Sequence, residues 1–222
     1  MYNWNPQGIA DLATELSKIG NEYRSIMAGI YRAFNNIGVE SQWTGKNYNR
    51  IADIFNQTKA TFEGWAEYLQ VDAPKIIFYD VAVNYSKAGE ASEEIYFSIA
   101  LNSDEIQNVE NTTEHADGSQ RIEPNTVRAI VSRDISQNFE IANEKLRQYY
   151  NQFNELAELE GEAAVVEIQN QLDDILKKAQ NIVMAFGDDV GDVIEKSIQN
   201  IELTNEETIN MARQLEAILT SK

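Results

Sequence analysis

The sequence contains no cysteine and a single histidine, His115. Without cysteine there is no disulfide, no thiol nucleophile and no thiolate metal site. One imidazole also excludes a metal site built from several histidines of one chain. The sequence has no Gly-rich phosphate loop, no nucleophile elbow and no Cys–His pair. It therefore predicts no catalytic residues, no metal ligands and no cofactor.

Basic residues are also scarce, with 18 Lys and Arg against 36 Asp and Glu and a formal net charge of −18. Nucleic-acid binding depends on Lys and Arg contacts to phosphate, so nucleic acid is excluded as a partner. An anionic membrane surface is disfavoured for the same reason. Apolar runs long enough to span a bilayer are missing, as are the basic and apolar regions of a signal peptide. We expect no export through the general secretory route, while another export route stays open.

Prolines are few, only 3 in 222 residues, which leaves long stretches free to form helix. Apolar residues recur at alternating steps of three and four in two segments, a heptad pattern typical of helices that pack in bundles. The first segment has Ile9, Leu12, Leu16, Ile19, Tyr23, Ile26, Ile30, Ala33 and Ile37, and the second has Tyr48, Ile51, Phe55, Thr58, Phe62, Trp65 and Leu69. Residues 1–72 are therefore predicted to form a hairpin of two long helices. The second helix should run from about Lys46 to Val71 and stop before Pro74.

The turn between these helices has the sequence Ser41-Gln42-Trp43-Thr44-Gly45. Gly45 permits a tight or left-handed backbone, and Trp43 can cover the apolar end of the hairpin. The alternative to a functional role is that both residues only shape the turn.

Residues 73–125 differ from the helical segments and are predicted to be an insertion. β-Branched, aromatic and other apolar residues recur at every second position over 77–85 and 95–101, with a Gly-bearing connection between them, which favours a β-hairpin, with a helix as the alternative. Residues 102–125 are polar and predict a loop. The hairpin is expected to cap the bundle or to offer an edge to a partner. Insertion into a membrane is disfavoured because Asp80, Asn84 and Ser98 interrupt its apolar faces.

The second half repeats the layout of the first. Helix-period apolar residues run from a start at Pro124 to Leu156, and a heptad series follows over 165–186. Residues 126–187 are therefore predicted to form a second helical hairpin, with Leu159 and Gly161 in its turn.

An acidic stretch with two glycines at 187–192 should break or bend the last of these helices. Residues 188–222 are predicted to be a C-terminal helical extension, with a capping box that starts at Thr204. The expected fold is mainly α: two long antiparallel hairpins that form a four-helix bundle, a small β-hairpin insertion and a C-terminal helix. Such a chain would build the four-helix bundle from its own two hairpins.

Two helices joined by Trp43-Thr44-Gly45, with Phe55 in the second helix, resemble the WXG100 (ESAT-6-like) family over about residues 8–72. The resemblance implies export by a type VII (ESX/Ess-like) secretion system and pairing as antiparallel four-helix dimers. It also implies that Trp43 and Gly45 form a recognised turn.

Two further residue pairs resemble elements of such proteins. Tyr68 and Asp72 match the family's Tyr-x-x-x-Asp/Glu export element, at a shorter distance from the tryptophan than in typical members. The alternative is an ordinary rim tyrosine followed by a helix N-cap. Leu159 and Gly161 stand in the second half where the Trp-x-Gly motif stands in the first. Leucine in place of tryptophan departs from that family and resembles the Leu-x-Gly of LXG type VII effectors.

The resemblance implies a non-enzymatic protein that binds other proteins, either the secretion machinery or a helical secreted protein. Such a protein is expected outside the cell or at its surface, by a route that needs no signal peptide. One alternative is a cytoplasmic helical adaptor or chaperone for a secreted partner. A less favoured alternative is a helical pore-forming protein with a β tongue.

Overall fold

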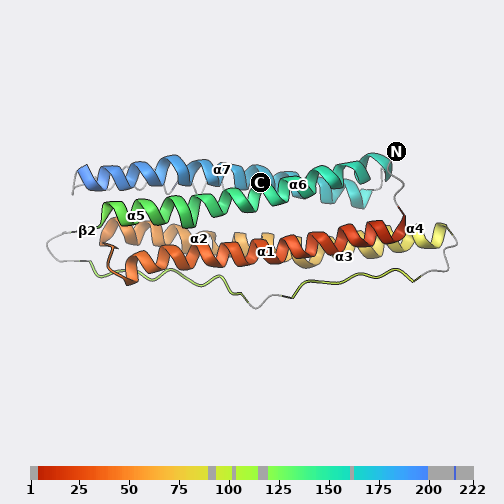
Figure 1. Ribbon diagram of the computed structural model, residues 1–222, viewed down its shortest axis with the longest axis horizontal. Helices are drawn as coiled ribbons and strands as arrows, with labels where there is room; N and C mark the ends of the chain where they lie inside the picture. Colours follow the sequence, from red (N-terminus) through yellow and green to blue (C-terminus); the bar gives the residue numbers. More distant parts are fainter. Residues whose placement is uncertain are drawn as a thin grey trace. The chain divides into compact units, whose positions relative to one another are not determined.

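The computed structural model describes residues 5–89, 94–101, 104–114, 120–160, 163–199 and 213. The chain is mainly helical, with a small two-stranded antiparallel sheet (Figure 1). Helices whose hydrogen bonds are of the π type carry the label η. In chain order the elements are α1 (Pro6–Val39), β1 (Trp43–Thr44), α2 (Lys46–Glu67), η1 (Tyr68–Asp72), α3 (Ala73–Ile76), η2 (Ile77–Ala82), α4 (Val83–Ala88), β2 (Arg121–Ile122), α5 (Pro124–Ile130), η3 (Val131–Ser136), α6 (Gln137–Glu160) and α7 (Ala163–Gln199).

The chain divides into two compact units, and each unit takes three separate stretches of sequence. Unit 1 comprises Met1–Ser25, Glu63–Asp104 and Ala142–Lys177, and unit 2 comprises Ile26–Phe62, Glu105–Ile141 and Lys178–Lys222. Each unit therefore contains residues from the first and from the second predicted hairpin.

Most residues of the heptad patterns in the first half are buried in α1, α2 and η1, whereas Ile19, Ile26, Ala33 and Trp65 are half-buried. Fully buried members of these patterns are Ile9, Leu16, Ile30, Ile37, Tyr48 and Leu69. In unit 2 the helices run antiparallel, because Tyr31 donates to the carbonyl of Phe55 while Phe34, further along α1, stacks on Tyr48, which lies earlier in α2. The first half therefore contains two long helices, and the chain is mainly helical, as predicted.

Pro74 does not stop the second helix, so the predicted end near Val71 is wrong. The helix continues from α2 through η1, α3 and η2 into α4. The carbonyl of Gln70, four residues before Pro74, cannot accept the usual helical bond because proline has no N–H. Instead the Ser17 hydroxyl donates to this carbonyl at 2.7 Å. The proline is tolerated because a neighbouring helix supplies a donor and π-type turns lie on both sides.

Residues 77–85, predicted as the first strand of a β-hairpin, are helical in η2 and α4. Ile77, Val81 and Ala82 are buried, whereas Tyr79 is 58% exposed. Burial at steps of four and five fits a helical face, so the alternation of β-branched and aromatic residues was misleading. The β tongue of the pore-forming alternative is therefore not formed by these residues. Within the described ranges, no helix has an apolar stretch long enough to cross a membrane.

The second half begins as predicted, with Pro124 in the first turn of α5. The acidic stretch 187–192 does not break the last helix, since α7 spans Ala163–Gln199, so the break allowed by the prediction is absent. Ile182 and Ile194 are buried on either side of it, and a glycine inside a helix costs only about 1 kcal/mol. The predicted extension beyond residue 199 lies outside the described residues, apart from Arg213, which is helical.

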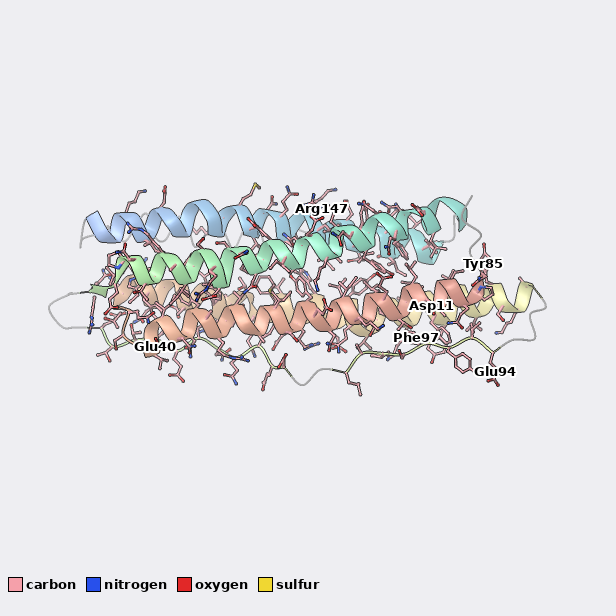
Figure 2. All side chains as sticks on the ribbon, viewed as in Figure 1. Asp11, Glu40, Tyr85, Glu94, Phe97 and Arg147 are labelled. Carbon is pink, nitrogen blue, oxygen red and sulfur yellow. The ribbon has the colours of Figure 1, made fainter. Side chains whose placement is uncertain are left out.

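Two stretches without helix or strand follow α4. We name residues 94–101 strap 1, which belongs to unit 1, and residues 105–114 strap 2, which belongs to unit 2. Figure 2 shows Glu94 and Phe97 of strap 1 alongside α1. The Gln7 side chain of α1 donates to the carbonyl of Tyr96 at 3.1 Å and accepts from its N–H at 2.9 Å. Strap 1 is therefore held by its backbone, although its residues were predicted to form a strand.

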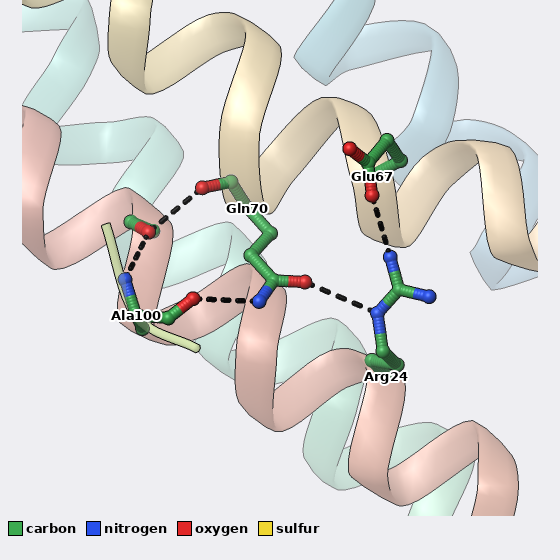
Figure 3. A network of polar contacts seen from close by, with 5 residues as sticks. Arg24, Glu67, Gln70 and Ala100 are labelled. Atoms are coloured by element: carbon green, nitrogen blue, oxygen red, sulfur yellow. Dashed lines mark hydrogen bonds and ion pairs between the residues drawn. The ribbon is translucent and has the colours of Figure 1, made fainter. Parts of the chain in front are cut away.

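A partly buried polar network holds strap 1 at a second point (Figure 3). The Ser17 hydroxyl accepts from the N–H of Ala100 at 2.8 Å, and Gln70 Nε2 donates to the carbonyl of Ala100 at 2.7 Å. Arg24 Nε donates to Gln70 Oε1 at 3.1 Å, and its guanidinium pairs with Glu67 at 2.8 Å. Ser17 therefore serves two backbone groups at once: the Gln70 carbonyl, which receives no N–H from Pro74, and the N–H of Ala100 in strap 1.

Replacing Ser17 with alanine should lower the free energy of unfolding by about 2–3 kcal/mol. The change leaves a buried carbonyl and a partly buried N–H without their partner, and each such group costs about 1–3 kcal/mol. Urea unfolding followed by circular dichroism measures the loss. Ser132→Ala, at an exposed serine of η3, is the control and should change stability by less than about 0.5 kcal/mol. A loss for Ser17→Ala no greater than that of the control would contradict this role.

Candidate binding site at the Trp43 turn

The turn between α1 and α2 contains two left-handed residues and is closed by a short sheet. Ser41 has a φ of 57° and Gly45 a φ of 101°. β1 pairs antiparallel with β2, and Trp43 stands opposite Ile122. The chain thus returns from a distant part of the sequence to cover the turn.

Trp43 is a core residue, since none of its surface is exposed. Its ring centroid lies 6.4 Å from that of Phe34 and 6.0 Å from that of Tyr48, with the rings edge to face. The indole Nε1 has no hydrogen-bond partner among the described residues. A partner that recognises this turn therefore contacts the surface that the indole supports, not the indole itself.

Glycine is favoured at position 45 by its positive φ, and the side chain of Gln120 packs close to it. A φ of 101° lies in the region that favours glycine. A Cβ at this position would lie 2.9 Å from Cγ of Gln120. The N–H of Gly45 also donates to Oγ1 of Thr112 at 2.9 Å. The glycine of the Trp-x-Gly motif thus shapes the turn and contacts strap 2.

Strap 2 lies against the same hairpin, where two asparagines of α2 hold its backbone. Asn56 donates from Nδ2 to the carbonyl of Val109 at 2.9 Å and accepts at Oδ1 from its N–H at 2.8 Å. Asn49 makes the same pair of bonds to Thr112, at 3.0 and 2.7 Å. These amide side chains satisfy backbone groups that a sheet would otherwise satisfy.

A surface pocket of about 480 Å³ lies where the end of α1, the turn and strap 2 meet. Its lining residues are Gly38, Val39, Ser41, Thr44, Glu110, Asn111, Thr112, Thr113 and Arg121. Most of these side chains are polar or charged. The turn and strap 2 therefore form one continuous candidate site that is suited to hydrogen bonding.

Tyr48 of α2 is a buried residue that packs beneath the surface of this site. The Tyr48 hydroxyl donates to the carbonyl of Phe34 at 3.3 Å. Burial raises the pKa of Tyr48 far above its usual range, and the nearby Glu110 carboxylate adds to this effect. Tyr48 therefore stays a neutral hydrogen-bond donor at physiological pH.

The predicted export element does not lie at a helix end. Tyr68 and Asp72 are the first and last residues of η1, inside a helix that continues. Burial, with smaller contributions from the charges of Glu167 and Asp72, raises the pKa of Tyr68 to about 12. Asp72 is exposed and makes no side-chain cap, so its interpretation as an N-cap is wrong.

The predicted motif residues belong to different units. Trp43 and Gly45 lie in unit 2, whereas Tyr68, Asp72 and Leu159 lie in unit 1. Leu159 is in the last turn of α6, and Gly161 lies outside the described residues. Trp43 and Gly45 are therefore the predicted motif residues that take part in the candidate site.

Sequence reasoning missed the residues that hold the two straps, although their spacing was a usable signal. Six of these residues lie at multiples of seven from one another within each helix, whereas Ser17, which also binds strap 1, does not. The set comprises Gln7, Thr14 and Asn35 on α1 and Asn49, Asn56 and Gln70 on the second helix. Heptad spacing places such residues along one side of a helix, so a polar stripe marked the face that binds the straps.

Comparison with known proteins gives no match: no family model fits the sequence, and no curated protein or solved structure is similar enough to count as a match.

Proposed function

We propose that this protein acts by binding other proteins, as a WXG100-like component that is exported by or associated with a type VII secretion system. The observation that carries the proposal is the turn itself. Trp43 is buried between Phe34 and Tyr48, and Gly45 has a left-handed backbone directly before α2. The Trp-x-Gly motif lies between two long helices, and its tryptophan and glycine have distinct structural roles. These features support the resemblance to the WXG100 family in addition to the sequence match.

The second half of the chain is proposed to take the place of the second molecule in a dimer of hairpins. Three contacts support this. In unit 1 the Tyr149 hydroxyl donates to the carbonyl of Leu12 at 3.1 Å, and Lys145 pairs with Glu22. In unit 2 the rings of Phe62 and Phe139 lie 5.9 Å apart. On this proposal, the two hairpins form a four-helix bundle within one chain, which acts as a monomeric pseudo-dimer.

The export proposal is tested by following the full chain in the culture medium of a bacterium that has a type VII system. We expect release into the medium that is lost when the secretion ATPase is deleted. Asp72→Ala should also abolish most of the release, because this exposed carboxylate is the part of the Tyr68–Asp72 element that is open to a partner. Immunoblots of medium and cells measure the outcome.

Asp80→Ala provides the matched control, since Asp80 is an exposed acid on the same continuous helix. It should leave release unchanged. Retention of the chain in the cells of both strains would contradict the export proposal. Co-purification of the retained chain with one partner would then favour the cytoplasmic adaptor.

A further inference from the structure

The surface of the α1–α2 hairpin in unit 2 binds polypeptide backbone through side chains. Asn56 and Asn49 each bind both backbone groups of one residue, Val109 and Thr112 respectively. Asn35 of α1 accepts from the next N–H along the strap, that of Glu110, at 2.8 Å. Five backbone groups of strap 2 are therefore held by three asparagines, and none of these bonds depends on the strap's side chains.

The spacing of the two asparagines on α2 matches an extended chain. Asn49 and Asn56 are two helical turns apart, which is a rise of about 10.5 Å. Their partners Thr112 and Val109 are three residues apart, and three extended residues span about 10 Å. The helix therefore fixes the register and the conformation of the bound segment, which must be close to fully extended.

Side chains of strap 2 add selectivity at three positions. Ile106 is 1% exposed and Val109 is 3% exposed, so both are buried in the described structure. The Thr112 hydroxyl donates to Asn49 Oδ1 at 2.9 Å and accepts from the N–H of Gly45 at 2.9 Å. The surface thus selects an apolar residue, a second apolar residue three positions later, and a hydroxyl residue three positions after that.

We propose that this hairpin surface is a binding site for an extended peptide segment of a partner protein, and that strap 2 occupies it as an internal ligand. The partner segment has the same chemistry as Ile106, Val109 and Thr112 in their spacing. A tethered segment competes at an effective concentration on the order of millimolar. Partner binding therefore requires release of strap 2. The proposal goes beyond export and does not depend on it.

The test uses a fluorescent peptide with the sequence of residues 104–114 and the full chain, with binding measured by fluorescence anisotropy. The wild-type chain should bind the peptide weakly, because strap 2 fills the site. The double variant Ile106→Asp, Val109→Asp places charges in the buried positions and should release strap 2. We expect this variant to bind the peptide at least about tenfold more tightly than the wild type.

Adding Asn56→Ala to the double variant should weaken peptide binding again by about tenfold, because it removes two backbone contacts without altering the peptide. A peptide with aspartate at the two apolar positions should not bind. Circular dichroism verifies that each variant keeps its helices, and Val109→Ser replaces the double variant if that chain unfolds.

Three results would overturn the proposal. One is a folded, released variant that does not bind the peptide. Another is binding that Asn56→Ala leaves unchanged. The third is a wild-type chain that dimerises while the released variant binds no peptide, which would assign the surface to a second copy of the chain.

Discussion

Replacing Gly20 with alanine is expected to lower the free energy of unfolding by about 3 kcal/mol. A Cβ at this position of α1 would lie 2.3 Å from the backbone nitrogen of Gln70 and 2.6 Å from the carbonyl carbon of Leu69. These are backbone atoms of a helix, so they cannot rotate away as a side chain would. The helices must separate at the point where Ser17 binds the Gln70 carbonyl. Urea unfolding measures the loss.

Gly29→Ala is the matched control, because Gly29 lies in the same helix and a Cβ there meets nothing within 4 Å. Alanine lowers the conformational entropy of the unfolded chain and suits a helix better than glycine. Gly29→Ala should therefore raise stability by about 0.5–1 kcal/mol. Equal effects of the two substitutions would show that the close approach at Gly20 does not constrain the helices.

Trp43→Ala is expected to destabilise the protein by about 3–5 kcal/mol, the usual cost of removing a buried tryptophan side chain. The indole is fully buried and contacts the rings of Phe34 and Tyr48 at the end of the hairpin. Its loss leaves a cavity beneath the sheet that joins β1 to β2. Thermal or urea unfolding followed by circular dichroism tests this prediction.

Trp65→Ala serves as the comparison, since Trp65 of α2 is only half-buried. This substitution should lower the free energy of unfolding by clearly less than Trp43→Ala. A loss below about 1 kcal/mol for Trp43→Ala would contradict the core role of the indole.

The result also decides how export experiments are interpreted. Loss of export in Trp43→Ala would report unfolding, so Trp43→Phe, which keeps an aromatic ring in place, is the better variant for testing recognition of the turn.

The long helices could be predicted from the sequence because helix periodicity is local. Leu16 and Ile30 lie at steps of three and four from their neighbours, and such spacing places a residue on one helical face whatever lies opposite. The same argument located the turn at Trp43 and Gly45. Positive φ at Gly45 follows from its residue type and its place between two helices.

The errors have a common physical cause. Pro74 is a sound reason to end a helix, and alternation over 77–85 is a sound reason to predict a strand. Both expectations hold only for a segment without tertiary support. Ser17 is 53 positions away from Gln70 in the sequence, yet its hydroxyl supplies the donor that Pro74 cannot. Local pattern cannot reveal a partner at that distance.

By itself, then, the sequence determined that α1 and α2 are long helices with one apolar face each, and it excluded thiol and multi-histidine chemistry. Only the tertiary structure decided that the second helix passes Pro74, that Trp43 is covered by β2 and that strap 2 lies on the hairpin. The reason is the range of the interactions. Helical burial depends on neighbours three or four residues away, whereas the bonds of Asn49 and Asn56 join residues that are 63 and 53 positions apart.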